Sequence, residues 1–372
     1  MLRLTSLLSL PVPVSINYWW NFGSLLGACL ILQILRGLFL SLHFSPRVLF
    51  AFSRVVHLIQ DVQFGWVIQG THARGASIFF ICLYLHLSRG LYFKSFKLHG
   101  PWLRGVRILL ITIAAAFLGY VLPWGQISFW GATVITGLLS AFPGGEMALA
   151  WFWGGNSVGE PTLNRFFSFH YLLPIIILVV VAVHLLLLHS TGSRNPLSRS
   201  RRRIKTRFYP FFVSKDLISG IFVGVALIII LIIAPDMFGD HENFIPASSS
   251  LTPAHIQPEW YFLFAYAILR SIPNKIGGVL ALILAICLFW TLPLFNFLRG
   301  EASKGLFKIS ICLFFSTVLL LSWIGGLPVE APYLEVGKIL SILYFVFLFT
   351  PFLIKFYLCS SLIASILYSG IN

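Results

Sequence analysis

Four histidines in this sequence share a spacing that could hold two metal-centred cofactors. His72 and His86 lie in one apolar segment, His170 and His184 lie in another, and the members of each pair are 14 residues apart. On an α-helix, 14 residues return to within ~40° of the starting direction and rise ~21 Å. Each helix would therefore present two imidazoles on one face, with one imidazole in each half of a membrane.

If both helices run in the same direction, His72 is level with His170 and His86 is level with His184. Two imidazoles at one level suit a flat cofactor whose iron is bound from both sides, as in a low-spin, six-coordinate haem with no open position for oxygen. A single histidine in an apolar helix is more often a packed, hydrogen-bonded residue than a ligand. Two matched pairs favour ligands, and therefore two stacked haems that transfer electrons.

Glycines in the neighbouring apolar segments repeat this spacing. Gly23 and Gly37 are 14 residues apart, and so are Gly105 and Gly119. A macrocycle between helices needs neighbours without side chains where it lies flat. Glycine is also common in membrane helices because it allows close packing. The repeated coincidence with the histidine spacing favours clearance for haem, so we assign these four glycines to cofactor binding.

The composition predicts the helices that would position these residues. Apolar residues make up 58% of the chain and charged residues 10%, which indicates an integral membrane protein. We predict an all-α fold with eight transmembrane helices, the first four forming a bundle around the haems, plus short surface helices. The apolar segments span approximately 22–42, 65–90, 103–123, 166–189, 217–235, 276–298, 308–326 and 338–358.

The placement of charge predicts the topology. The formal net charge is +15, but the basic residues concentrate in the loops 88–107 and 190–215. The positive-inside rule places these loops on the side from which the chain was inserted, together with both termini. We therefore exclude nucleic-acid binding. The long connections 125–165 and 236–275 fall on the opposite, acidic side, and the first has the tryptophans and glycines of short amphipathic helices.

Cysteine usage limits how a haem could be attached. The five cysteines lie singly within apolar stretches, without a C-x-x-C-H motif or a zinc-like spacing. Any haem would therefore be held non-covalently by axial ligands. The first ten residues resemble a short signal sequence, but Pro11 and Pro13 follow without a small-x-small cleavage site. We interpret them as a retained surface segment.

Ordered motifs along nearly the whole chain resemble the cytochrome b family, the membrane core of ubiquinol:cytochrome c oxidoreductases (bc1 complexes, or complex III). Their number and order make the resemblance specific. Eight helices in one chain and the 14-residue spacing favour the bc1 type over the shorter b6 type. The motifs occupy Trp19–Ser24, Gly119–Gln126, Trp130–Thr136, Pro258–Asn274 and Trp323–Gly326.

The resemblance implies a function and a setting. Ubiquinol would be oxidised at an outer site, and one electron would cross through two haem b groups to quinone at an inner site, contributing to proton translocation in a Q cycle. The implied partners are a Rieske iron–sulfur protein, cytochrome c1, other complex III subunits, a second copy of the complex in a homodimer, and membrane lipid including cardiolipin. The compact length favours the mitochondrial inner membrane, with a bacterial cytoplasmic membrane as the alternative.

The resemblance also assigns the haem ligands. His72 and His170 would ligate a low-potential haem near the acidic face, and His86 and His184 a high-potential haem near the basic face. Arg89 is assigned to cofactor binding as well. We expect an N-terminal haem-binding domain over residues 1–200 and a C-terminal domain over 201–372 that carries the quinol-site loop.

Two quinone sites follow from the same resemblance. At the outer site Glu259 would accept a proton from quinol, although a lone loop glutamate is otherwise a solvated or capping residue. At the inner site His189 and Asp216 would hold the quinone carbonyls and deliver protons, although both could instead be helix-terminal residues that interact with the helix dipoles. The other outer residues are Tyr120, Phe117, Gly131 and Tyr266, and the other inner residues are Ser193, Lys215, Trp20 and Asn21.

The sequence departs from the family pattern near the low-potential haem. Gln69 stands three residues before His72, where the family has an arginine suited to a haem propionate. Arg74 is a poor substitute because it lies ~200° around the helix from His72. An arginine within a membrane helix needs a partner. We therefore expect Arg36, beside Gly37, to approach that propionate.

A second departure is the basic run Ser198–Arg207. It is explained either by an exaggerated positive-inside bias or by contact with anionic lipid or a neighbouring subunit.

Two other classes of protein compete with the electron-transfer interpretation. A secondary transporter would have more carboxylates within the membrane and inverted repeats, and a chlorophyll scaffold commonly needs one axial ligand rather than two.

Overall fold

The computed structural model describes residues 9–197, 204–294 and 301–350. Helices dominate these residues, and the strands found there form one short two-stranded sheet. The predicted all-α class is therefore confirmed. The chain divides into two compact units between Glu259 and Trp260.

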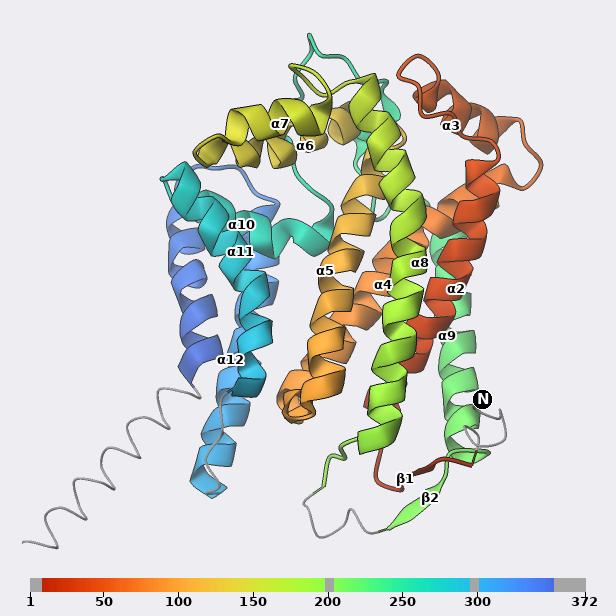
Figure 1. The fold of residues 1–372 in the computed structure, drawn as a ribbon, viewed down its shortest axis with the longest axis vertical. Helices are drawn as coiled ribbons and strands as arrows, with labels where there is room; N and C mark the ends of the chain where they lie inside the picture. The colour runs from red at the N-terminus through yellow and green to blue at the C-terminus, as the bar shows by residue number, and fades with distance from the viewer. Residues whose placement is uncertain (1–8, 198–203, 295–300, 351–372) are drawn as a thin grey trace, which may run out of the picture. The chain divides into compact units, whose positions relative to one another are not determined.

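The first unit is built from five long helices (Figure 1). Helix α5 packs along α8, α2 packs along α4, and α9 packs against both α4 and α2. The compact units keep α9 together with α4. The functional division near residue 200 stays a prediction. The five helices are α2 (Phe22–Ser41), α4 (Gly65–Tyr92), α5 (His99–Val121), α8 (Glu160–Thr191) and α9 (Phe211–Ile233).

Short elements occupy both ends of this unit. Helices α6 (Gln126–Gly137) and α7 (Gly145–Trp153), joined by the 3₁₀ helix η3 (Leu138–Ala141), confirm the surface helices predicted for 125–165. Figure 1 shows α6 and α7 running roughly crosswise to α5 and α8, at one end of this unit. Helix α3 (Ala51–Gln60) was not predicted. At the opposite end, strand β1 (Pro11–Pro13) pairs antiparallel with β2 (Lys205–Arg207), which joins the N-terminal segment to the basic loop before α9.

The second unit contains three long helices and one short one. The short helix α10 (Leu263–Ser271) packs on two of the long ones, α11 (Lys275–Thr291) and α12 (Glu301–Gly325). The helix Tyr333–Thr350 is joined to these by buried hydrogen bonds. The Tyr344 hydroxyl donates to the Ala285 carbonyl at 2.9 Å, and the Ser341 hydroxyl donates to Ser271 at 3.0 Å. Short 3₁₀ helices η6 (Trp260–Phe262) and η7 (Leu292–Leu294) flank α10 and α11.

Seven helices in the described part of the chain are long and apolar enough to cross a membrane. The eighth predicted crossing, α4, has 28 residues but carries two arginines, two histidines and a glutamine. These polar residues explain why composition alone does not select it. The seven are Tyr18–Ser41, His99–Val121, Glu160–Thr191, Phe211–Ile233, Lys275–Leu294, Gly305–Gly325 and Tyr333–Thr350.

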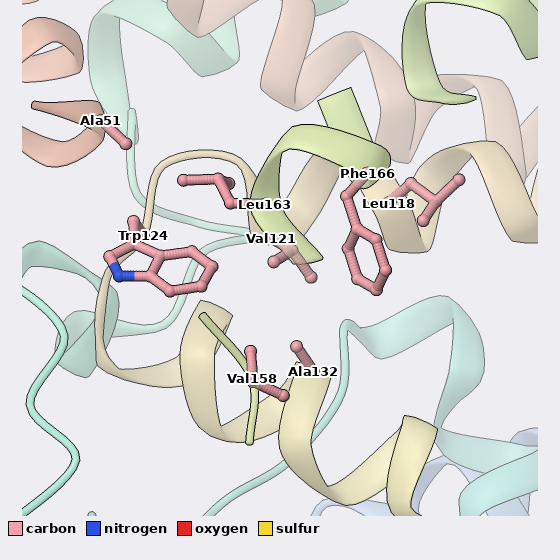
Figure 2. Close-up of a cluster of buried hydrophobic side chains, with 8 residues drawn as sticks. All are labelled: Ala51, Leu118, Val121, Trp124, Ala132, Val158, Leu163 and Phe166. Atoms are coloured by element: carbon pink, nitrogen blue, oxygen red, sulfur yellow. The ribbon is translucent and has the colours of Figure 1, made fainter. Parts of the chain in front are cut away.

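A buried apolar cluster fixes the acidic end of the first unit (Figure 2). Phe166 and Leu163 from the start of α8 are fully buried against Val121, at the end of α5, and Trp124, just beyond it. Helices α3 and α6 and the turn before α8 contribute Ala51, Ala132 and Val158. The cluster therefore sets the height of α8 against α5, and with it the level of the residues that α8 carries.

Truncating this cluster should destabilise the protein. Phe166→Ala leaves a cavity among fully buried neighbours and should cost about 3 kcal/mol or more of unfolding free energy. Phe169→Ala is the matched control, since Phe169 is on the same helix but 49% exposed. Thermal unfolding in detergent should show a clear fall in Tm for the first variant and little change for the second. Equal shifts in Tm would contradict this role of the cluster.

Candidate functional site

Helices α4 and α8 bring the four histidines together in two pairs. The ring centroids of His72 and His170 are 6.2 Å apart, and those of His86 and His184 are 6.4 Å apart. Two metal–nitrogen bonds of ~2.0 Å, plus ~1.1 Å from each nitrogen to its ring centroid, add up to about 6.2 Å. Each pair is therefore spaced for one metal ion held between two imidazoles.

Hydrogen bonds to α5 fix the ring orientation of the two α8 histidines, and with it the nitrogen that is left for the paired histidine of α4. His170 Nδ1 lies 2.8 Å from the Ala115 carbonyl oxygen, and His184 Nδ1 lies 2.8 Å from that of Pro101. A carbonyl oxygen can only accept, so each Nδ1 carries the proton. Each Nε2 then keeps its lone pair for a metal, which is the tautomer that metal-ligating histidines adopt when a carbonyl orients them.

The four predicted glycines each face one of the four histidine rings. An added Cβ at Gly119 would collide with the His170 imidazole, with Nδ1 only 2.8 Å away. The glycines therefore let each ring lie directly against the backbone of a neighbouring helix. Clearance for a macrocycle, the reason that the sequence suggested, stays a prediction. For the other three, the distance from an added Cβ to histidine Cε1 would be 3.2 Å for Gly23 and His86, 3.2 Å for Gly37 and His72, and 3.6 Å for Gly105 and His184.

Buried polar groups occur beside His86 and just beyond the end of α4. The Arg89 guanidinium lies over the Trp20 ring at 5.1 Å, and its Nη2 is 3.2 Å from His86 Nδ1. Trp20 Nε1, Arg89 Nε and Ser95 Oγ are buried and have no hydrogen-bond partner within the described residues. Buried donors normally have partners, so these three fit an anionic group supplied from outside the chain, such as a haem propionate. Sequence reasoning missed Ser95, although its position just after the end of α4, close to Arg89 in sequence, was a usable signal.

The candidate inner quinone residues lie around the starts of α2 and α9 and at the end of α8. Asn21 Nδ2 donates to the Ser219 hydroxyl at 2.9 Å, and the Asp216 carboxylate faces the Ser24 hydroxyl. Lys215 Nζ lies over the rings of Tyr18 and Phe212, at 5.6 and 5.4 Å. His189 is at the end of α8 and Ser193 follows it. Within the described residues, no hydrogen bond joins His189 or Ser193 to Asp216.

The candidate outer residues of the first unit share an electrostatic environment. Tyr120 and Glu259 are within electrostatic reach of each other, and both are within reach of Asp240 and Arg74. Burial raises the pKa of Glu259 to about 8; Arg74 opposes this rise and Asp240 adds to it. A carboxyl group with such a pKa can both accept and release a proton near neutral pH.

The other predicted outer residues are placed separately. A Cβ added at Gly131 in α6 would meet no atom within 4 Å, so space is open beside it. The Phe117 ring packs against Phe166 at 5.9 Å. Tyr266 belongs to the second unit, where the Arg270 guanidinium lies 5.3 Å from its ring centroid.

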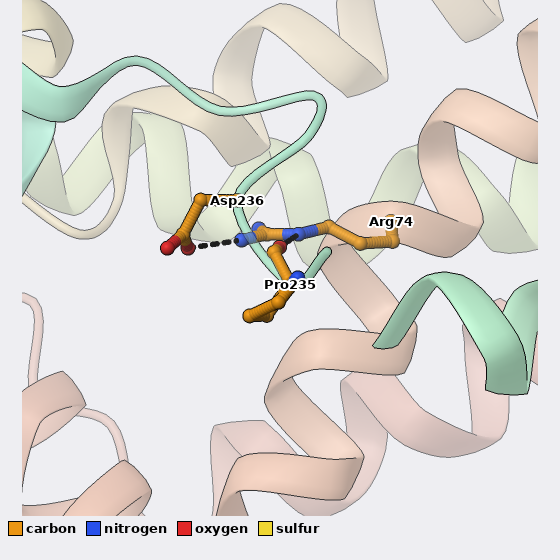
Figure 3. A network of polar contacts seen from close by, with 3 residues as sticks. All are labelled: Arg74, Pro235 and Asp236. Carbon is orange, nitrogen blue, oxygen red and sulfur yellow. Dashed lines mark hydrogen bonds and ion pairs between the residues drawn. The ribbon is translucent and has the colours of Figure 1, made fainter. Parts of the chain in front are cut away.

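The arginines that depart from the family pattern have different partners. Arg36 Nη1 donates to the Thr71 carbonyl at 3.2 Å, next to His72 on α4. The approach of Arg36 to a propionate stays a prediction. Arg74 instead bonds the residues after α9, Pro235 and Asp236 (Figure 3). Most of the basic run lies outside the described residues; its last part forms β2.

Comparisons with known proteins agree with this geometry. Residues 7–192 match the family model described as cytochrome b/b6/petB, and residues 246–345 match that described as cytochrome b(C-terminal)/b6/petD. A chain from a solved structure described as a hyperthermophilic respiratory complex III aligns over 95% of each chain, with 30% sequence identity and a TM-score of 0.88. The protein belongs to the cytochrome b family. It is a multi-pass membrane protein that binds haem b and serves respiratory electron transfer.

A methyl group at Gly119 tests the packing around His170. Gly119→Ala should displace the imidazole, because the added Cβ overlaps the ring, and most of the haem at that level should be lost. Gly27→Ala is the matched control, because a Cβ there meets nothing within 4 Å. Haem content per purified chain measures the effect. Full haem content in Gly119→Ala would show that the ring has room to move.

Proposed function

We propose that this chain is the haem-bearing catalytic subunit of a quinol:cytochrome c oxidoreductase. It oxidises ubiquinol at an outer site and passes one electron across the membrane to quinone at an inner site. The observation that carries this proposal is that one helix bundle holds two pairs of imidazoles at two levels. The ring centroids are 6.2 Å apart in one pair and 6.4 Å apart in the other. Two haem b groups, held at those levels, would supply a one-electron path through the apolar core.

The role of the histidines follows from their placement. His72 with His170 would hold the low-potential haem, and His86 with His184 the high-potential haem. The ~21 Å rise between levels divides the crossing into two short steps. Arg89, Trp20 and Ser95 would bind propionate at the second level, and Arg36 would bind propionate at the first. The residues 1–200 would form the haem-binding part of the chain.

At the outer site, Glu259 would accept a proton from the quinol hydroxyl. Its raised pKa of about 8 supports this role, because a base is most effective when its pKa is near the working pH. Tyr120 shares the electrostatic environment of Glu259, and the open space at Gly131 leaves room for a quinone ring. Phe117 and Tyr266 would shape the site, and residues 201–372 would carry its loop.

At the inner site, His189 and Asp216 would hold the quinone carbonyls and supply protons. The starts of α2 and α9 support this role, because they are joined by the Asn21–Ser219 hydrogen bond and carry Lys215 and Trp20. Ser193 would contribute from the end of α8. Protons would enter on the basic side and leave on the acidic side.

The proposed setting is a complex III in the mitochondrial inner membrane, with a bacterial cytoplasmic membrane as the alternative. The Rieske protein would take the other electron and pass it to cytochrome c1. Further subunits, a homodimeric complex and bound cardiolipin complete the proposal. It is supported by the similarity to the chain of a respiratory complex III.

Optical spectroscopy tests the four-ligand arrangement. The reduced-minus-oxidised spectrum of the complex should show two low-spin b haems per chain. His170→Ala should remove about half of that signal, since one of the two pairs is broken. Intact, folded protein without haem would reject electron transfer and favour a transporter. Loss of all haem from His170→Ala with the fold retained would show that the two levels are not independent.

The pH dependence of quinol oxidation tests Glu259. The wild-type rate should rise with pH and level off above about 8, because the acceptor is the carboxylate form and its pKa is about 8. Glu259→Gln should lower the rate at least about tenfold and remove this dependence, because the base is lost. The exposed Glu242 in the same loop provides the control Glu242→Gln. A wild-type rate and profile in Glu259→Gln would exclude Glu259 as the acceptor.

A further inference from the structure

A charged group is held within the acidic end of α4. Arg74 follows His72 by two residues, and its side chain is only 15% exposed. A cation in a membrane helix is costly unless it is paired. Arg74 Nε donates to the Pro235 carbonyl and Nη2 donates to Asp236 Oδ1 at 3.2 Å, so one edge of the guanidinium binds two neighbouring residues (Figure 3).

These contacts tie α4 to the loop that carries Glu259. Pro235 and Asp236 form the turn directly after α9, where the loop 234–259 begins. Farther along, this loop is held to α6 and the turn before it by backbone hydrogen bonds, with Gln126 N donating to Ile245 O at 3.0 Å and Ala247 N to Trp124 O at 3.1 Å. Arg74 therefore fixes the start of the loop, ahead of the stretch that these backbone bonds hold.

The fixed guanidinium also acts on Glu259 through space. Among the described groups of the first unit, Arg74 on α4 is the cation and Asp240 of the loop the anion that act on Glu259, and Tyr120 on α5 lies in the same field. A nearby positive charge favours the carboxylate form of a glutamate, and a nearby negative charge opposes it. The position of Arg74 thus influences how readily Glu259 takes the form that accepts a proton.

We propose that Arg74 is a positioning residue of the outer site, which clamps the turn after α9 and holds a positive charge near Glu259. This proposal rests on the proposed function of Glu259 as the proton acceptor. It gives Arg74 a role apart from the haem propionate. Gln69 lacks the positive charge of the family's arginine at this position. Arg74 does not replace that charge at the haem, because its guanidinium is bonded to Pro235 and Asp236 of the loop.

Removing the charge tests the proposal in the assembled complex. Arg74→Gln should move the rising limb of the pH–rate profile to higher pH by up to about one unit, because burial of Glu259 is then no longer opposed by the guanidinium. Arg74→Lys keeps the charge but lacks the fork, so its shift should be smaller. Arg165→Gln is the control: Arg165 bonds the carbonyls of Trp151 and Phe152, and its loss should leave the profile unchanged.

The double variant separates the two proposals. Combined with Glu259→Gln, Arg74→Gln should leave the residual rate and the flat pH profile of Glu259→Gln unchanged, because its effect passes through Glu259. A further fall in that residual rate, or a wild-type profile in Arg74→Gln alone, overturns the role of Arg74 while the acceptor assignment stands. A wild-type profile in Glu259→Gln overturns both.

Haem content and the b-haem spectrum show whether each variant has assembled. If Arg74→Gln loses its haem, Arg74→Lys replaces it as the test variant. Its pH–rate profile is then measured with and without Glu259→Gln. A partial shift that Glu259→Gln abolishes supports the proposal. The wild-type profile in Arg74→Lys then overturns it.

Discussion

The hydrogen bonds from His170 and His184 to backbone carbonyls of α5 are the constraint on which the rest of the site depends. They settle the tautomer of each ring and aim its second nitrogen at a histidine of α4. Helix α5 can approach α8 this closely because Gly105 and Gly119 leave room for the rings. The packing of α5 along α8, and the apolar cluster at the acidic end of this contact, therefore help to position the histidine pairs.

The two ends of the first unit solve different electrostatic problems. At the basic end, Trp20 and Arg89 place buried donors beside His86, where an anionic group would satisfy them. At the acidic end, the loop 234–259 contributes Asp236, Asp240 and Glu259. Arg74 on α4 pairs with Asp236 and lies within electrostatic reach of Glu259. Fixed charge thus accompanies the candidate haem level at one end and the candidate proton acceptor at the other.

The two arginines that depart from the family pattern illustrate how far helix geometry carries a prediction. Arg74 lies on the wrong side of α4 to reach a group bound by His72, as its spacing predicts, but no periodicity could indicate that its partner follows α9, more than 160 residues later. The position of Arg36 beside Gly37 predicted proximity to His72, and its hydrogen bond to Thr71 agrees with that proximity. The backbone carbonyl as its partner was not foreseeable.

Period and composition determined the membrane helices, the two histidine levels and the matching glycines, because the 3.6-residue turn and the apolar bilayer act on each segment separately. Only the tertiary structure decided which atoms meet. It showed that the glycines contact histidine rings and that α9 packs with α4 and α2, and it revealed Ser95 as a buried donor. The strand pair at the N-terminus escaped prediction because three-residue strands carry little periodic signal, and α3 did so because a ten-residue amphipathic helix is too short and too polar to stand out as an apolar segment. Pairing between distant segments depends on packing and polar satisfaction across the whole unit, which no single stretch of sequence contains.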